Sequence, residues 1–167
     1  MILLNGRGQI GSALKLIEKD TSDLDVIVYH TWNFLDKSLY TQKNEFEKLY
    51  KYLINRKEDK KFVFISTKSK SINYYTEYKK LAETLVEEVC KSYLIIRLPN
   101  LLGKGICSRF KEEKDILAIG QIELLTIDDA IKLIINNIKY NSNSIVELQG
   151  TNIDASLLQN IIKFGSK

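Results

Sequence analysis

Short apolar runs alternate with longer segments of helical period along most of this chain. Apolar runs of about four to eight residues, bounded by polar ones, are typical of strands that are buried on both faces. Segments in which apolar residues recur at three- and four-residue steps are typical of amphipathic helices. Regular alternation of the two predicts a mostly parallel sheet and an α/β fold. The expected strands are "MILL" from Met1, "DVIVYH" from Asp25, "FVFIS" from Phe62, "YLIIRLP" from Tyr93 and "SIVELQ" from Ser144.

The expected helices lie between and after these strands. The first runs from Ile10 to about Lys19, the second ends near Asn55, and the third covers Tyr75 to Lys91. Two more begin at Thr126 and at Asp154, the last capped by Asp154 and ended by Gly165. We predict no secondary structure for residues 104–121. The stripes expected to be buried are Phe46, Leu49, Tyr50, Leu53 and Ile54 on the second helix, and Leu81, Leu85 and Val89 with Ala82 and Val86 beside them on the third.

Length and composition restrict the class of protein. A chain of 167 residues with 44% hydrophobic and 28% charged residues is expected to form one compact domain, residues 1–167. No apolar run approaches the ~20 residues of a membrane span, and the first residues do not resemble a signal peptide. We therefore expect a cytoplasmic protein with Cys90 and Cys107 reduced. The single histidine predicts no metal site, and the net charge of +4, with aromatic residues at core spacing, does not favour nucleic acid.

A glycine motif follows the first strand. Gly6, Gly8 and Gly11 form GxGxxG at the expected junction of a strand and a helix. Glycines there let the chain turn tightly and let a pyrophosphate approach the amides at the positive end of the helix. The simpler alternative is a tight turn with no ligand. The predicted cofactor-binding residues of this loop are Gly6, Arg7, Gly8, Gln9, Ile10 and Gly11.

A tyrosine and a lysine lie one helical turn apart in "NYYTEYKKLAE". Tyr75 and Lys79 share a helix face, so that the ammonium can favour the deprotonated phenol of a general acid/base. Thr67, near the carboxyl end of the third strand, can add a hydroxyl that polarises a substrate alcohol or carbonyl. In a chain with nine tyrosines roughly one such pair arises by chance. The alternative is therefore a solvent-facing Tyr75 and a solvated Lys79.

The order of these motifs resembles the extended short-chain dehydrogenase/reductase family of NAD(P)-dependent nucleotide-sugar epimerases, dehydratases and reductases. The matching pieces, in order, are "NGRGQIG", "FVFIST", "YTEYKKLAE", "IIRLPNLLGKG" and "LLTIDDAIKLI". The resemblance implies a Rossmann-like, mostly parallel sheet of about five strands with helices on both faces. It also implies NAD or NADP as cofactor and a nucleotide-linked or other small sugar as substrate.

The resemblance also assigns roles to particular residues. Thr67 would be the hydroxyl partner, Tyr75 the catalytic acid/base, and Lys79 the residue that lowers the pKa of Tyr75 and binds the nicotinamide ribose. Pro99 and Asn100 would line the nicotinamide face. Three further positions have weaker expectations: Asp129 as a support of the site or as a helix cap, and His30 and Trp32 as residues that border the cofactor or simply pack.

The chain departs from the family pattern in two places. Only thirteen residues separate Gly11 from "DVIVYH", where the family usually inserts two further strands and a helix. The fold is therefore expected to be trimmed in the adenosine-binding half, which leaves the choice between NAD and NADP open, although Arg7 could meet a 2′-phosphate. The segment 104–121 is short where the family builds its substrate domain.

Two functions follow from these departures. The first is an NAD(P)-dependent oxidoreductase, epimerase or dehydratase acting on sugars in surface-polysaccharide biosynthesis. The second is a catalytically inactive relative that serves as a nucleotide-binding or protein-interaction module. Either way the first strand is expected near an open sheet edge, which a homodimer or another partner would cover.

Overall fold

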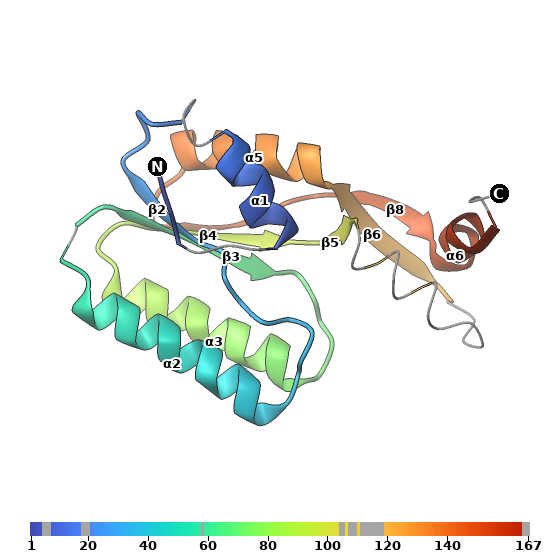
Figure 1. Ribbon diagram of the computed structural model, residues 1–167, viewed down its shortest axis with the longest axis horizontal. Coiled ribbons are helices and arrows are strands. Elements are labelled where there is room, and N and C mark those ends of the chain that lie inside the picture. Colours follow the sequence, from blue (N-terminus) through green and yellow to red (C-terminus); the bar gives the residue numbers. More distant parts are fainter. Residues whose placement is uncertain are drawn as a thin grey trace.

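The structure is a computed structural model that describes residues 1–4, 8–17, 21–57, 59–103, 106, 110 and 119–164. Its main sheet has five parallel strands in the order β1-β2-β3-β4-β7. A smaller sheet, in the order β5-β6-β8, lies beyond the carboxyl end of β4 (Figure 1). The strands are β1 (Ile2–Leu4), β2 (Val26–Tyr29), β3 (Lys61–Thr67), β4 (Tyr93–Leu98), β5 (Asn100–Leu102), β6 (Gln121–Thr126), β7 (Ser144–Glu147) and β8 (Thr151–Asp154). The helices are α1 (Gln9–Leu16), α2 (Leu39–Asn55), α3 (Tyr74–Val89), α5 (Ile127–Tyr140) and α6 (Ala155–Phe164).

Helices cover both faces of the main sheet, as the sequence predicts. Successive side chains of a strand point to opposite faces, and the two buried clusters follow this alternation. Helices α1 and α5 pack with the face that carries Val28 and Ile65. Helices α2 and α3 pack with the face that carries Ile27 and Phe64. The α/β fold with about five mostly parallel strands is therefore confirmed.

The connection through α1 has an unusual hand. From β1 to β2 and from β2 to β3 the chain steps across the sheet in the same direction. However, α1 lies on one face and α2 on the other (Figure 1). The two β-α-β connections therefore have opposite hands, although about 98% of such connections are right-handed. Loss of the strands expected between α1 and β2 accounts for this, because β1 is left as the terminal strand of the sheet.

The smaller sheet was missed by the sequence-based prediction. Strand β6 pairs in parallel with β5 and antiparallel with β8. Its strands resist prediction because β8 is polar and β6 passes directly into α5 at Thr126, which is also the N-cap of that helix. The apolar face of α6 closes a third cluster beside this sheet, with Phe110, Leu124, Leu158 and Ile162 buried.

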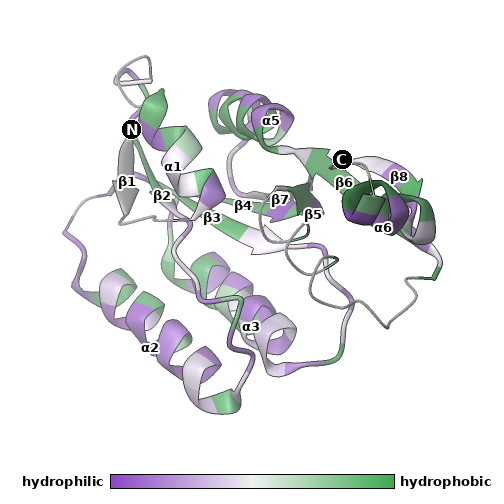
Figure 2. Ribbon diagram, turned by 45° about the vertical axis from the view of Figure 1, so that its right-hand side comes forward, coloured by the Kyte–Doolittle hydropathy of each residue, from purple (hydrophilic) through white to green (hydrophobic). Residues whose placement is uncertain are grey.

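The predicted buried stripe of α3 is confirmed only in part. Ala82 and Val86 are buried and Leu85 packs against the same cluster, whereas Leu81 and Val89 are 53% and 40% exposed. The side that packs inward carries Lys79 and Glu83, together with Thr76, Ala82 and Val86. Helix α2 behaves in the same way, since Tyr50 and Ile54 are exposed whereas Gln42, Glu45, Leu49 and Leu53 are buried. Figure 2 accordingly shows much hydrophilic colour on these two helices, although they pack against each other and the sheet.

Helix ends lie close to the expected positions. Helix α1 ends at Leu16, earlier than the Lys19 that we expected, and α3 covers Tyr74–Val89 in place of Tyr75–Lys91. The Asp154 carboxylate accepts the backbone N–H groups of Ser156 and Leu157, so the predicted cap is confirmed, whereas Gly165 lies outside the described residues. In the part of the chain that the structure describes, no helix is long and apolar enough to cross a membrane.

Candidate functional site

Three side chains of α3 bind the carboxyl end of β3 at intervals of one helical turn. Residues four apart on a helix share a face, and Tyr75, Lys79 and Glu83 form such a row. Tyr75 hydrogen-bonds the Thr67 side chain, and the Lys79 ammonium donates to the carbonyl of Ile65 at 2.7 Å. Glu83 accepts the hydroxyl of Ser66. The row fixes the helix to the strand end at which open α/β sheets bind ligands.

The phenol of Tyr75 lies against the hydroxyl of Thr67. Thr67 also accepts the backbone N–H of Ser69 at 3.1 Å, which orients its side chain. Burial raises the pKa of Tyr75, and the hydrogen bond with Thr67 opposes this shift. The pKa of Tyr75 is therefore raised, whereas an ammonium beside the phenol would lower it. Tyr75 is thus half-buried and protonated at neutral pH, and the alternative of a solvent-facing tyrosine does not describe it.

The ammonium of Lys79 is buried against two aromatic rings. The residue is 4% exposed, and Nζ lies 4.5 Å from the ring centroids of both Trp32 and Phe64. Burial lowers the pKa of Lys79 to about 7, against the opposing effects of Glu83 and Glu45. The alternative of a solvated surface charge is therefore wrong. The two roles predicted from the family resemblance, lowering the pKa of Tyr75 and binding a ribose, stay predictions.

This shift makes the stability of the protein depend on pH. Between pH 7 and 10.5 the unfolded chain keeps a proton on Lys79 that the folded protein has released. The free energy of unfolding therefore rises with pH in this window, by at most about 1.4 kcal/mol per pH unit. We expect urea unfolding midpoints to increase from pH 7 to 9, and Lys79→Met to flatten the increase. Equal slopes in the two proteins would contradict the buried, titrating lysine.

Glu83 connects the helix to two strands. Its carboxylate, 4% exposed, accepts Nε and Nη2 of Arg97 at 3.1 and 2.6 Å as well as the Ser66 hydroxyl. Arg97 on β4 also donates to Glu147 on β7 at 3.0 Å. A buried carboxylate is tolerated when it is paired and fully hydrogen-bonded. The network fixes the position of α3, and therefore of Tyr75, relative to strands β3 and β4.

The second half of the glycine motif lies at the start of α1. Gly8 is the N-cap of the helix with no side-chain cap. A Cβ added to it would meet no atom within 4 Å among the described residues, its chain neighbours aside. Gln9 begins the helix, and Ile10 and Gly11 in its first turn are buried. Gly103, at the end of β5, approaches Gln9 so closely that a Cβ there would overlap its side chain. Gly6 and Arg7 lie outside the described residues.

The other predicted residues occupy different places. Pro99 is buried between the two sheets, whereas Asn100 is exposed and begins β5. His30 follows β2; burial and the neighbouring Lys79 lower its pKa, and its Nε2 is buried with no partner among the described residues. Asp129 exchanges hydrogen bonds with Thr126 at the start of α5. Thr126 is the N-cap of that helix, and Asp129, three residues later, completes the cap by these reciprocal hydrogen bonds. This is close to the simpler of the two expectations, a role at the helix start.

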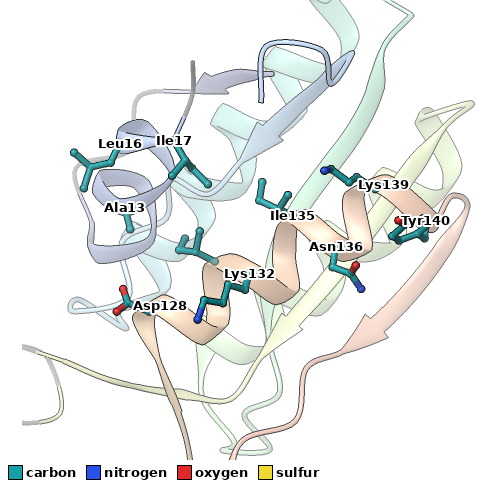
Figure 3. Close-up of a pocket in the computed structure, with 10 residues that line it drawn as sticks. Ala13, Leu16, Ile17, Asp128, Lys132, Ile135, Asn136, Lys139 and Tyr140 are labelled. Atoms are coloured by element: carbon teal, nitrogen blue, oxygen red, sulfur yellow. The ribbon is translucent and has the colours of Figure 1, made fainter. Parts of the chain in front are cut away.

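A hollow of about 620 Å³ lies away from this row, between α1 and α5 (Figure 3). Its apolar lining comes from Ala13 and Ile17 on one helix and Ile135 on the other. The charged groups of Lys132 and Lys139 belong to α5. The hollow shares no lining residue with the Thr67–Tyr75–Lys79 site. Trp32 was expected to border the cofactor or to pack, and it packs on Lys79. Gln42 was not predicted as its neighbour, since no apolar period marks a buried glutamine.

The fold is similar to that of solved nucleotide-sugar enzymes, several of them crystallised with NAD or NADP. The dTDP-4-dehydrorhamnose reductase of Bacillus anthracis, solved with NADP, matches with a TM-score of 0.73 and 15% identity, over 96% of this chain and 78% of that one. The UDP-glucose 4-epimerase of Thermotoga maritima, solved with UDP-glucose, matches with a TM-score of 0.60 and 16% identity, over 89% and 64%. The enzyme WbmG of Bordetella bronchiseptica, solved with NAD and UDP, matches with a TM-score of 0.61 and 10% identity, over 94% and 61%.

These similarities concern the fold. The chain spans less than two thirds of the length of the epimerase and of WbmG. No protein-family model matches the sequence, and no curated protein matches it. The resemblance predicted from the motifs is thus confirmed for the architecture.

Proposed function

We propose that the chain binds NAD or NADP and acts as an oxidoreductase, epimerase or dehydratase on a nucleotide-linked or small sugar. We extend this to a role in surface-polysaccharide biosynthesis in the cytoplasm. The observation that supports it most is the row of Tyr75, Lys79 and Glu83, which brings a protonated phenol against Thr67 at the carboxyl end of the sheet. The solved structures with this fold were crystallised with NADP, NAD, UDP-glucose or UDP.

The described part of the glycine loop fits a dinucleotide. The space over Gly8 is open, and its φ of −77° is one that any residue adopts, so the fold itself does not require a glycine there. The first turn of α1 has no acidic residue and no side-chain cap, which leaves its positive end suited to a phosphate. Gly8, Gln9, Ile10 and Gly11 would hold the pyrophosphate, with Gly6 and Arg7 before them, and Lys79, Pro99 and Asn100 would border the nicotinamide end.

The side chains of the site can bind, orient and move a proton. A nicotinamide held there would supply the hydride acceptor or donor. The Tyr75 hydroxyl, which is protonated at neutral pH, can donate a proton to a substrate carbonyl oxygen. In the opposite direction its deprotonated form would take the proton of a substrate hydroxyl. Thr67, oriented by the N–H of Ser69, can hold the same oxygen.

Gly8→Ala separates ligand binding from folding. Its two chain neighbours aside, the added methyl group meets no atom of the described residues within 4 Å, so we expect the unfolding midpoint to change little. It would occupy the space through which a pyrophosphate approaches the helix, so the Kd for NADPH should rise about tenfold or more. Fluorescence titration measures the Kd, and Ser12→Ala, an exposed change on the same helix, is the control. If Gly8→Ala and the parent protein bind NADPH with equal affinity, the glycine loop does not bind the pyrophosphate.

The open edge of the sheet supports a proposal about assembly. Within the described residues β1 pairs on one side only, with β2, and unpaired strand edges attract further strands. We propose that a second copy of the chain covers this edge. Light scattering after gel filtration should then give twice the chain mass of 19.3 kDa. A monomer across the micromolar range would contradict the homodimer and leave the edge to a different partner.

A second function, an inactive nucleotide-binding or interaction module, is favoured by two observations. Lys79 donates to Ile65 and contacts two rings, whereas the enzyme needs its ammonium at the ribose. The open edge of β1 also suits an interaction module. The two functions differ in whether Tyr75 matters for turnover.

A further inference from the structure

Trp32 is fixed over the ammonium of Lys79 by a contact that the family motifs do not include. Its ring centroid and that of Phe64 each lie 4.5 Å from Nζ, and the two rings meet edge to face with their centroids 6.0 Å apart. Among the described residues, the ammonium of Lys79 donates one hydrogen bond, to the carbonyl of Ile65. Aromatic faces attract cations, most strongly where water is excluded. The two rings and the carbonyl therefore all contact the ammonium of Lys79, a residue that is 4% exposed.

Gln42 on α2 holds the indole in place. The indole Nε1 donates to Oε1 of Gln42 at 2.7 Å. The amide of Gln42 donates to the carbonyls of Asn33 and Asp36 at 2.7 and 2.5 Å. Gln42 is fully buried, so these bonds form without competition from water. The segment 30–38 that carries Trp32 is therefore tied to α2 and not merely laid over the site.

The carboxylates near Lys79 are engaged by other partners. Glu83 binds Arg97 and Ser66, and Glu45 on α2 pairs with Lys48 at 2.6 Å. His30 is the other titratable neighbour. It cannot stabilise the ammonium of Lys79, because its own charged form is also a cation. No ion pair of Lys79 is found among the described residues, so the aromatic rings take a larger share in holding the cation.

We propose that Trp32 is a positioning residue that acts through Lys79. The indole, held by Gln42, sets the place of the ammonium one helical turn beyond Tyr75. It thereby sets how strongly Lys79 can bind the ribose hydroxyls of a nicotinamide dinucleotide. The binding part of this inference rests on the proposed function, whereas the positioning part concerns the protein without any ligand.

The first measurement needs no ligand. Acetylation of Lys79 by acetic anhydride, followed by mass spectrometry, reports its accessibility. We expect Trp32→Leu to raise the rate of labelling at least tenfold, and Trp32→Phe, which keeps a ring, to restore most of the protection. Phe34→Leu, a change at a half-exposed residue of the same segment, should have no effect. Unchanged labelling in Trp32→Leu with a native circular dichroism spectrum would overturn the positioning role.

The second measurement tests the dependence on Lys79. NADPH affinity, followed by nicotinamide fluorescence, should fall about tenfold in Trp32→Leu and in Lys79→Met, the size of one buried cation–π contact. The double variant should bind no more weakly than the weaker single variant. Fully additive losses would mean that Trp32 acts independently of Lys79 and would overturn the inference. If the parent protein binds no NADPH, the proposed function fails, and labelling alone decides the positioning role.

Discussion

Tyr75→Phe is expected to abolish most turnover and to leave the fold intact. Removing one hydroxyl takes away the proton donor, and general acid/base catalysis contributes about 10²–10⁴-fold to a rate. The ring of phenylalanine fills the same space, so only the hydrogen bond with Thr67 is lost, at about 1 kcal/mol of stability. The rate is measured as conversion of whichever nucleotide sugar the parent protein turns over, by chromatography, because an epimerase or dehydratase consumes no NADPH overall.

The same variant separates the two proposed functions. An enzyme loses its rate but keeps its affinity for the dinucleotide, because the hydroxyl is needed for chemistry and not for binding. Tyr78→Phe, a change on the same helix at a ring that packs against Phe46, is the matched control. A Tyr75→Phe protein with the rate of the parent would exclude Tyr75 as the acid/base. A parent protein that binds NADPH but turns over no nucleotide sugar would favour the inactive module.

Glu83→Ala is expected to cause the largest loss of stability. The substitution leaves Arg97 without its buried partner and the Ser66 hydroxyl without an acceptor. Removing one member of a buried ion pair costs about 3–5 kcal/mol, which lowers the melting temperature of a chain of this length by roughly 6–20 °C. Thermal and urea unfolding measure both quantities.

A neighbouring glutamate provides the control for that change. Glu88 lies on the same helix but is exposed, so Glu88→Ala should alter the free energy of unfolding by less than about 0.5 kcal/mol. Equal effects of the two substitutions would show that the network around Glu83 does not hold α3 to the sheet. The account of how Tyr75 is positioned would then lose its main support.

The order of strands and helices could be predicted because it depends on alternation alone. The short spacing between Gly11 and "DVIVYH" predicted the missing strands, and the structure confirms β1 as the terminal strand. The smaller sheet could not be predicted in this way. Strand β8 has little apolar pattern, and β6 runs into a helix without an intervening loop.

The inner face of α3 shows why the site was only partly predictable. A hydrophobic period identifies Leu81 and Val89, but these side chains are largely exposed. Lys79 and Glu83 are buried instead, because each finds partners on β3 or β4 that lie far away in the sequence. The i, i+4 spacing predicted that Tyr75 and Lys79 share a face. It could not predict that Trp32 and Phe64 enclose the lysine.

The central claim is that this trimmed fold still binds a nicotinamide dinucleotide. The most direct test is titration of the purified protein with NADPH and with NADH, followed by energy transfer from Trp32, the only tryptophan of the chain, to the nicotinamide. We expect saturable binding with a micromolar Kd for at least one of them. No binding of either at millimolar concentration would contradict the claim and would leave the Tyr75–Lys79–Glu83 row as a purely structural connection between helix and sheet.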